Sequence, residues 1–249
     1  MTTESIWELR LVGGWQLQRA GRPVKVALRQ QRLLAVLALL GGQPRSSLAA
    51  LLWPDSTDAQ AAGSLRESIF LVNPQVPALL SQTARLVGLK EDVGVDVRQI
   101  KVRAARLEEE PDLSHVRTML QNMQDSHLLP GWYEDWVVLE QERWQRLRLS
   151  VLERLAGILL VKGHIDAAME AACAAIAIEP LRESAHTLLM QCHLAEGNNA
   201  EALHTYQSLS LRLRQEYGVS PSPVVMDVVG PLLAGGQDPV PELPEANRR

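Results

Sequence analysis

The chain has 249 residues, of which 46% are hydrophobic and 22% are charged. This length allows two small domains, and the composition excludes a wholly disordered chain. No apolar run reaches the roughly 18 residues of a membrane span, and Met1 to Arg10 lacks a signal-peptide pattern, so we expect a cytoplasmic protein. Cys173 and Cys192 lack the close spacing of a zinc site, and we expect both to be small core residues.

The formal net charge of −4 is unevenly distributed along the chain. Residues 1–103 carry 13 Lys and Arg against 8 Asp and Glu, a net +5, whereas residues 104–249 carry 12 against 21, a net −9. A basic first part favours contact with phosphate, and an acidic second part favours a different partner. The alternative is that these are two unrelated surface charges.

The first part of the chain contains strand patterns followed by helix patterns. Alternation predicts three short antiparallel strands, at 6–11, 15–19 and 24–28. Three helices are expected next: one over 29–40 that ends at Gly41-Gly42, one capped by Ser46-Ser47 over 48–53, and one capped by Thr57 or Asp58 that ends at Asn73-Pro74. A hairpin follows over 79–89, with a polar tip at 82–84. This is the element order of a winged helix, whose third helix enters the major groove of DNA.

From Val95 onward the pattern is almost wholly helical, with a long helix expected over 134–162. A repeat appears when Gly163 is aligned with Gly197, because Ala168 then falls on Ala202 at the same offset of 34 residues. This period is typical of tetratricopeptide helical hairpins, in which glycine ends the first helix and alanine allows close packing. Ser222-Pro223 is expected to start a last short helix.

The predicted fold class is therefore an α+β winged helix-turn-helix followed by an all-α, tetratricopeptide-like domain. The expected domains are residues 1–94 and 95–234, and a flexible tail is expected over 235–249.

Several strings resemble the Streptomyces antibiotic regulatory protein family, whose second half is called the bacterial transcriptional activator domain. In the first half they are Gln31-Arg32-Leu33-Leu34-Ala35, Leu51-Leu52-Trp53-Pro54-Asp55, Ser64-Leu65-Arg66 and Val95-Asp96-Val97. In the second half they are the run from Leu129 to Trp136, the run from Glu179 to His186, and the run from Gly218 to Pro223. Together they span roughly residues 6–234 in the family's order.

The resemblance implies a transcriptional activator that binds double-stranded promoter DNA, recruits RNA polymerase and often acts as a homodimer. In the family, the second half of the third helix usually carries arginines where this sequence has Leu71, Asn73 and Pro74. Because phosphate contacts supply much of the affinity for DNA, their loss predicts weaker binding.

The residues that remain for DNA contact lie on the helices and the wing of the predicted winged helix. They are Arg29, Arg32, Arg45, Ser46, Gln60, Ser64, Arg66, Asn73 and Arg85. The arginines other than Arg66 are expected to meet the phosphate backbone, and Arg66 either a guanine edge or a phosphate. The alternative hypothesis is an adaptor, in which a degenerate winged helix docks proteins and no longer binds DNA specifically.

The sequence gives no candidate for a catalytic residue, a cofactor or a metal ion. The histidines of the second half lack the spacing of a metal pair, and the chain has neither a glycine-rich phosphate loop nor a nucleophile elbow. Trp132 and Trp136 are expected to share one helical face and, with Trp144, to fix the helices to the winged helix. We therefore expect no enzymatic activity, no small-molecule ligand and no membrane contact.

Overall fold

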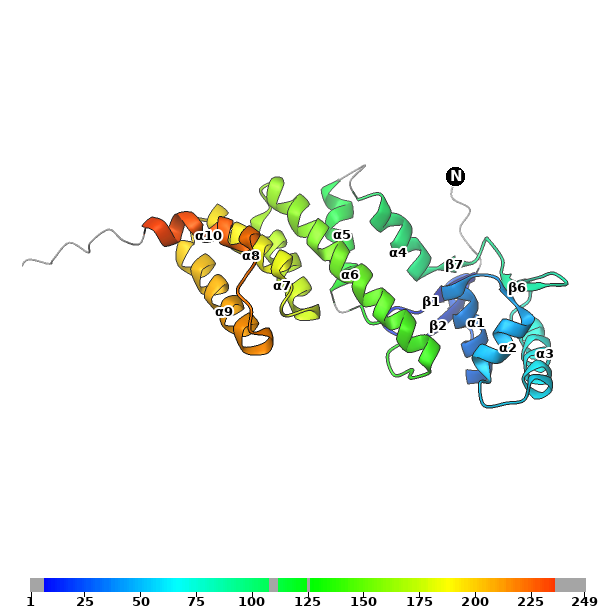
Figure 1. The fold of residues 1–249 in the computed structure, drawn as a ribbon. Helices are drawn as coiled ribbons and strands as arrows, with labels where there is room; N and C mark the ends of the chain where they lie inside the picture. Colours follow the sequence, from blue (N-terminus) through cyan, green and yellow to red (C-terminus); the bar gives the residue numbers. More distant parts are fainter. Residues whose placement is uncertain (1–6, 108–111, 125, 236–249) are drawn as a thin grey trace, which may run out of the picture. The chain divides into compact units, whose positions relative to one another are not determined.

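The computed structural model describes residues 7–107, 112–124 and 126–235, apart from the side chains of Asn73 and Gln75 (Figure 1). The chain forms two compact units, Met1–Leu147 and Arg148–Arg249. None of the described helices has the length and apolar character that crossing a bilayer requires.

The first unit begins with a small four-stranded sheet in the order β3-β2-β1-β7. Its strands are β1 (Trp7–Arg10), β2 (Gln16–Arg19), β3 (Arg22–Pro23) and β7 (Gly94–Val95). Strand β1 pairs antiparallel with β2 and parallel with β7. The third strand expected over 24–28 is wrong in its bounds, because Leu28 already belongs to the next helix and the Val26 carbonyl accepts a hydrogen bond from the Gln31 side chain.

Three helices follow, as predicted: α1 (Leu28–Leu40), α2 (Arg45–Leu52) and α3 (Asp58–Gln75). Thr57 caps α3 through a capping box with Gln60, as its position in the sequence indicated. The predicted serine cap of α2 is wrong, because the helix begins earlier, at Arg45 after Pro44, and no side chain caps it. Helix α3 also continues through Pro74, which lies in its last turn.

The predicted hairpin is the wing of the fold, formed by β5 (Leu80–Gln82) and β6 (Leu86–Leu89). The short strand β4 (Gln43–Pro44) adds to it by pairing Pro44 with Leu86. A Cβ atom at Gly88 would lie only 3.2 Å from the Cα atom of Gly42, so the close approach of these two strands favours glycine at this position. The wing is thereby fixed beside the start of α2 (Figure 1).

The remaining elements of the first unit are α4 (Asp96–Ala105), α5 (Leu113–Met123) and the first part of α6 (Asp135–Val161). The segment before α6 lies along the end of β1, where the N–H of Leu129 donates to the carbonyl of Leu11 at 2.8 Å. The ring of Trp132 stacks on Trp15 at 6.3 Å, and the indole N–H of Trp144 donates to the carbonyl of Ser126 at 2.6 Å. These contacts give Trp132 and Trp144 the structural role that the sequence predicted.

Trp132 and Trp136 do not share a helical face, which corrects the sequence prediction. Leu129 and Gly131 have positive φ values of 42° and 84°, so the chain turns there and α6 starts only at Asp135.

The second unit contains the helical repeat that the offset of 34 residues predicted. Its helices after α6 are α7 (Ile165–Ile178), α8 (Glu183–Ala195), α9 (Asn199–Tyr217) and α10 (Pro223–Gly235). The aligned glycines Gly163 and Gly197 have φ values of 76° and 78°, and the aligned alanines Ala168 and Ala202 are both fully buried. In both hairpins the glycine thus adopts a positive φ at the turn, and the alanine packs in the core.

Two expectations for the second half have different outcomes. Cys192 is buried as expected, but Cys173 is exposed, because α7 turns Ala172 and Ala175 toward the core instead. Of the tail expected over 235–249, Gly235 ends α10, and 236–249 lie outside the described residues.

His186 makes the stability of the second unit depend on pH. It is 6% exposed, and its Nε2 lies 3.0 Å from the carbonyl oxygen of Pro180, so Nε2 carries the proton that this bond needs. Nδ1 is buried without a hydrogen-bond partner among the described residues. Burial lowers the pKa of His186 below its usual 6.5, and the charge of Arg212 lowers it further.

A histidine whose pKa is lowered by folding takes up its proton more readily in the unfolded chain. We therefore expect the stability of the second unit to be complete above pH 6.5 and to fall as the pH drops below it. Urea unfolding followed by far-ultraviolet circular dichroism at several pH values measures this. His186→Gln should flatten the profile, whereas His204→Gln, at an exposed position, should leave it unchanged. An unchanged profile in His186→Gln would contradict the assignment.

Candidate nucleic-acid interface

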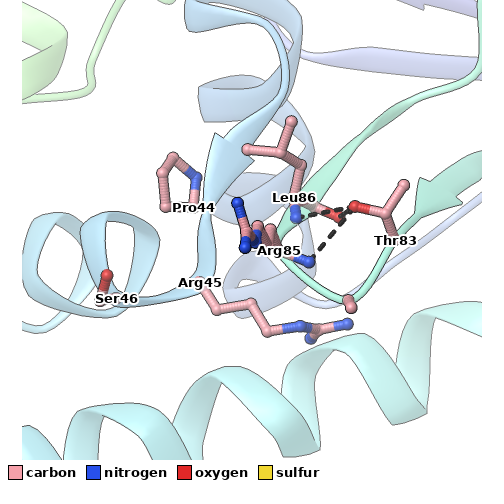
Figure 2. A pocket seen from close by; sticks show the side chains of 7 residues that line it. Pro44, Arg45, Ser46, Thr83, Arg85 and Leu86 are labelled. Atoms are coloured by element: carbon pink, nitrogen blue, oxygen red, sulfur yellow. Dashed lines mark hydrogen bonds between the residues drawn. The ribbon is translucent and has the colours of Figure 1, made fainter.

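Three of the predicted DNA-contact residues lie around one open pocket between the start of α2 and the wing. Arg45 and Ser46 line it from α2, and Arg85 lines it from the tip of the wing (Figure 2). Its volume is about 790 Å³, and its other lining residues are Pro44, Thr83, Ala84 and Leu86. The pocket therefore combines two guanidinium groups with the first turn of a helix.

The turn at the tip of the wing is ordered by one hydroxyl group. Thr83 Oγ1 accepts hydrogen bonds from the backbone N–H groups of Arg85, at 3.3 Å, and Leu86, at 2.9 Å (Figure 2). This turn fixes the backbone from which the Arg85 side chain projects. Across the pocket, Nη2 of Arg45 donates to Oε1 of Gln82 at 3.1 Å. Within the described part of the chain, neither arginine is paired with a carboxylate.

The first turn of α2 adds positive potential at the same place. Its N-cap is Pro44, and no side chain of the described residues caps the helix by a hydrogen bond. Such groups, together with the helix dipole, attract anions. Strand β4 leads directly into this turn, so its pairing with β6 brings the helix start beside the wing. The arrangement suits an extended anion such as a phosphate backbone.

The predicted contact residues of α3 differ in how freely they are presented. Arg66 is exposed, and its side chain has no hydrogen bond or ion pair with any described residue. Gln60 is exposed but takes part in the capping box, where its Oε1 accepts from the N–H of Thr57 at 3.2 Å. Ser64 is partly buried, and the side chain of Asn73 lies outside the described part.

Arg29 and Arg32 are directed into the first unit rather than toward the pocket. Arg29 forms an ion pair with Glu67 at 2.7 Å, donates to the carbonyl of Ser64 at 3.0 Å, and lies over the ring of Trp53 at 5.3 Å. It thus ties α1 to α3. Arg32 pairs with Glu134 at 2.7 Å and donates to the carbonyl of Leu52 at 2.9 Å.

The structure also shows a surface residue that the sequence prediction omitted. Phe70 is 73% exposed on α3, although Leu65, Ile69 and Val72 of the same helix are buried. The signal was present in the sequence, because Phe70 falls outside the periodic stripe that these three residues form. Thr83 was predicted only as part of a polar tip, and its role in ordering the turn depends on hydrogen bonds that the folded wing creates.

Comparison with known proteins identifies the helical part directly. The family model described as "Bacterial transcriptional activator domain" matches residues 97–233. The chain is 28% identical over 231 residues to the regulatory protein AfsR of Streptomyces coelicolor, covering 88% of this chain and 23% of that protein. It is 27% identical over 238 residues to AfsR of Streptomyces griseus, covering 90% and 24% respectively. The chain thus spans about a quarter of the length of these relatives.

The fold has a counterpart among solved structures. Mycobacterium tuberculosis EmbR, in complex with a low-affinity phosphopeptide, superposes with a TM-score of 0.74 at 18% identity, over 92% of this chain and 65% of that one. This likeness confirms the predicted fold class of a winged helix followed by a tetratricopeptide-like helical part. The family match covers more than half of the chain and agrees with the resemblance found in its sequence. The chain therefore belongs to the bacterial transcriptional activator domain family, which confirms the resemblance to the Streptomyces antibiotic regulatory proteins seen in its sequence.

Proposed function

We propose that this protein regulates transcription by binding promoter DNA through its winged helix. The observation that carries the proposal is the juxtaposition of Arg45, Arg85 and the uncapped start of α2 around one open pocket, without a neutralising carboxylate among the described residues. Duplex DNA presents a regular row of phosphates, and such a cluster of donors is suited to hold one or two of them.

Helix α3 has the second role in this proposal, which is to read base edges. In a winged helix the third helix enters the major groove, while the wing and helix starts hold the backbone. Arg66 is the exposed cation of α3, and its guanidinium group is suited to a guanine edge or a phosphate. Gln60, Ser64 and Asn73 remain the polar contacts proposed for the same helix. Arg29 and Arg32 contribute mainly by holding the helices in place, since both are engaged within the protein.

The rest of the proposal concerns the other partners. We assign DNA binding to residues 1–94 and activation, by contact with RNA polymerase, to the helical residues 95–234. The acidic surplus of the helical part favours contact with a basic protein surface. Binding as a homodimer to two half-sites would compensate for the few cations on α3. These events would take place in the cytoplasm, where the bacterial chromosome lies.

The adaptor hypothesis also has an observation in its favour. Phe70 and Leu71 are 73% and 39% exposed on α3, where the family usually carries a more basic surface. Exposed apolar groups often mark protein contacts. The two functions differ in one measurable property, which is whether the folded chain retains duplex DNA at low salt.

The test is selection of binding sites by the full chain from a pool of randomised duplexes at about 50 mM salt, followed by gel retardation of the enriched sequence. We expect a defined motif that occurs as two copies of one half-site, and a retarded complex that Arg66→Ala and Arg85→Ala weaken. Arg117→Ala, at an exposed arginine on α5, is the matched control and should bind as the wild type does. If the folded protein retains no duplex at this salt concentration, DNA binding is wrong and the adaptor is favoured.

A further inference from the structure

The outward face of α3 carries a strip of exposed apolar residues that do not pack in the core of the first unit. Phe70 is 73% exposed, Leu71 is 39% exposed and Pro74 is also exposed. Phe70 lies five residues after the buried Leu65, which places it about 140° around the helix axis from that core residue. The phenyl ring therefore projects away from the core of the first unit.

The surroundings of the ring leave it open and without an unpaired carboxylate on the neighbouring turns of α3. Gly63, two turns earlier on the same side of the helix, has no atom within 4 Å of the place where a Cβ would stand. Arg66, one turn before Phe70, is exposed and adds a cation. Glu67 is the carboxylate nearest in sequence, and its charge is neutralised by Arg29 at 2.7 Å. An anionic partner can therefore approach the ring without meeting an unpaired carboxylate on this part of α3.

We propose that Phe70 determines sequence specificity by packing against the C5-methyl group of a thymine in the major groove. This inference rests on the proposed function, which is DNA binding by the winged helix. A phenyl ring offers no hydrogen bond to a base edge, and the thymine methyl is the apolar group that the major groove presents. DNA is favoured over a protein partner because the strip lies on the helix that carries Arg66, in the same winged helix as the Arg45 and Arg85 cluster. These cations would require charge compensation in an apolar protein interface.

The experiment uses the duplex selected by the full chain and removes one methyl group at a time. Each thymine of the bound sequence is replaced singly by deoxyuridine, which pairs identically but lacks the C5-methyl group. We expect the dissociation constant to rise about fourfold at one or two positions, the effect of exposing one methyl group. Phe70→Ala should weaken binding of the thymine duplex to a similar extent and should no longer distinguish thymine from uracil there. Phe70→Leu should retain most of the discrimination.

Val102→Ala is the matched control, since Val102 is 53% exposed on α4, away from the α3 strip in the sequence. It should distinguish thymine from uracil as the wild type does. If the wild type binds the duplex but no uracil substitution matters, or if Phe70→Ala keeps the wild-type discrimination, the thymine contact is wrong and DNA binding stands. If the folded wild type binds no duplex at all, both proposals fail. If Phe70→Ala leaves DNA affinity intact but dissociates a dimer in light scattering, Phe70 belongs to a protein interface and the thymine contact is wrong.

Discussion

Replacing Arg45 and Arg85 together with alanine is expected to lower the affinity for DNA more than tenfold at about 150 mM salt and to flatten its salt dependence. Each phosphate that a cation neutralises contributes about 0.9 to the slope of log affinity against log salt, so the loss of two contacts should reduce the slope by about 1.8. The two residues line one pocket beside the start of α2 and have no competing carboxylate among the described residues. Fluorescence anisotropy of a labelled duplex between about 50 and 200 mM salt measures both quantities.

The matched control removes the same charge elsewhere in the first unit. Arg22 and Arg103 are exposed arginines of β3 and α4, and the Arg22→Ala/Arg103→Ala protein has the same net charge as the pocket variant. We expect its slope to remain close to that of the wild type. Equal slopes for the two double variants would show that the protein attracts DNA through its net charge alone, and the pocket would lose its assigned role.

Asp96→Ala is expected to destabilise the first unit by about 3 kcal/mol, a large share of the stability of an ordinary domain. One oxygen of Asp96, Oδ2, accepts the backbone N–H groups of Leu11 and Val12, each at 2.9 Å. The other, Oδ1, accepts the N–H of Val97 at 2.7 Å and so holds the start of α4. Burial raises the pKa of Asp96, and these N–H groups oppose the rise. Removing the carboxyl group leaves partly buried donors without this partner at the end of β1, and an unsatisfied buried donor costs about 1 to 3 kcal/mol.

Urea unfolding followed by tryptophan fluorescence isolates this effect. All six tryptophans lie within Met1–Leu147, so their emission reports on the first unit, whereas circular dichroism reports on both. Glu91→Ala, at an exposed carboxylate shortly before β7, should change the stability by less than about 0.5 kcal/mol. A loss in Asp96→Ala no larger than in Glu91→Ala would show that the three hydrogen bonds contribute little.

The string Val95-Asp96-Val97 lies at the junction between β7 and α4. Val95 is the last residue of β7, and Asp96 is the first residue of α4. Arg98, half a turn later, reaches α1, where its Nε donates to the carbonyl of Ala38 at 3.1 Å and its Nη2 to that of Leu37 at 2.9 Å. Two charged side chains thus join the end of β1, the end of α1 and the start of α4.

Elements whose signals are local could be predicted from the sequence. The buried helix α1, the Thr57 cap of α3 and the wing hairpin were all visible in the sequence, as a dense apolar run that ends at glycine, as capping chemistry and as turn residues. The 34-residue offset predicted equivalent positions for Ala168 and Ala202, and both are buried. These predictions succeeded because helix period, caps and repeats depend on residues close together in the chain.

Which of the predicted cations share a surface depends on contacts between elements that are far apart in the sequence. Arg29 and Arg45 look alike in sequence, but folding brings Glu67 beside the first, whereas the pairing of Pro44 with Leu86 brings the second to the wing beside Arg85. The long arginine side chain takes whichever partner lies within reach, and these partners come from other elements of the fold. The ion pair with Glu67 engages the guanidinium group of Arg29, whereas Arg45 has no carboxylate partner among the described residues and is therefore available for phosphate.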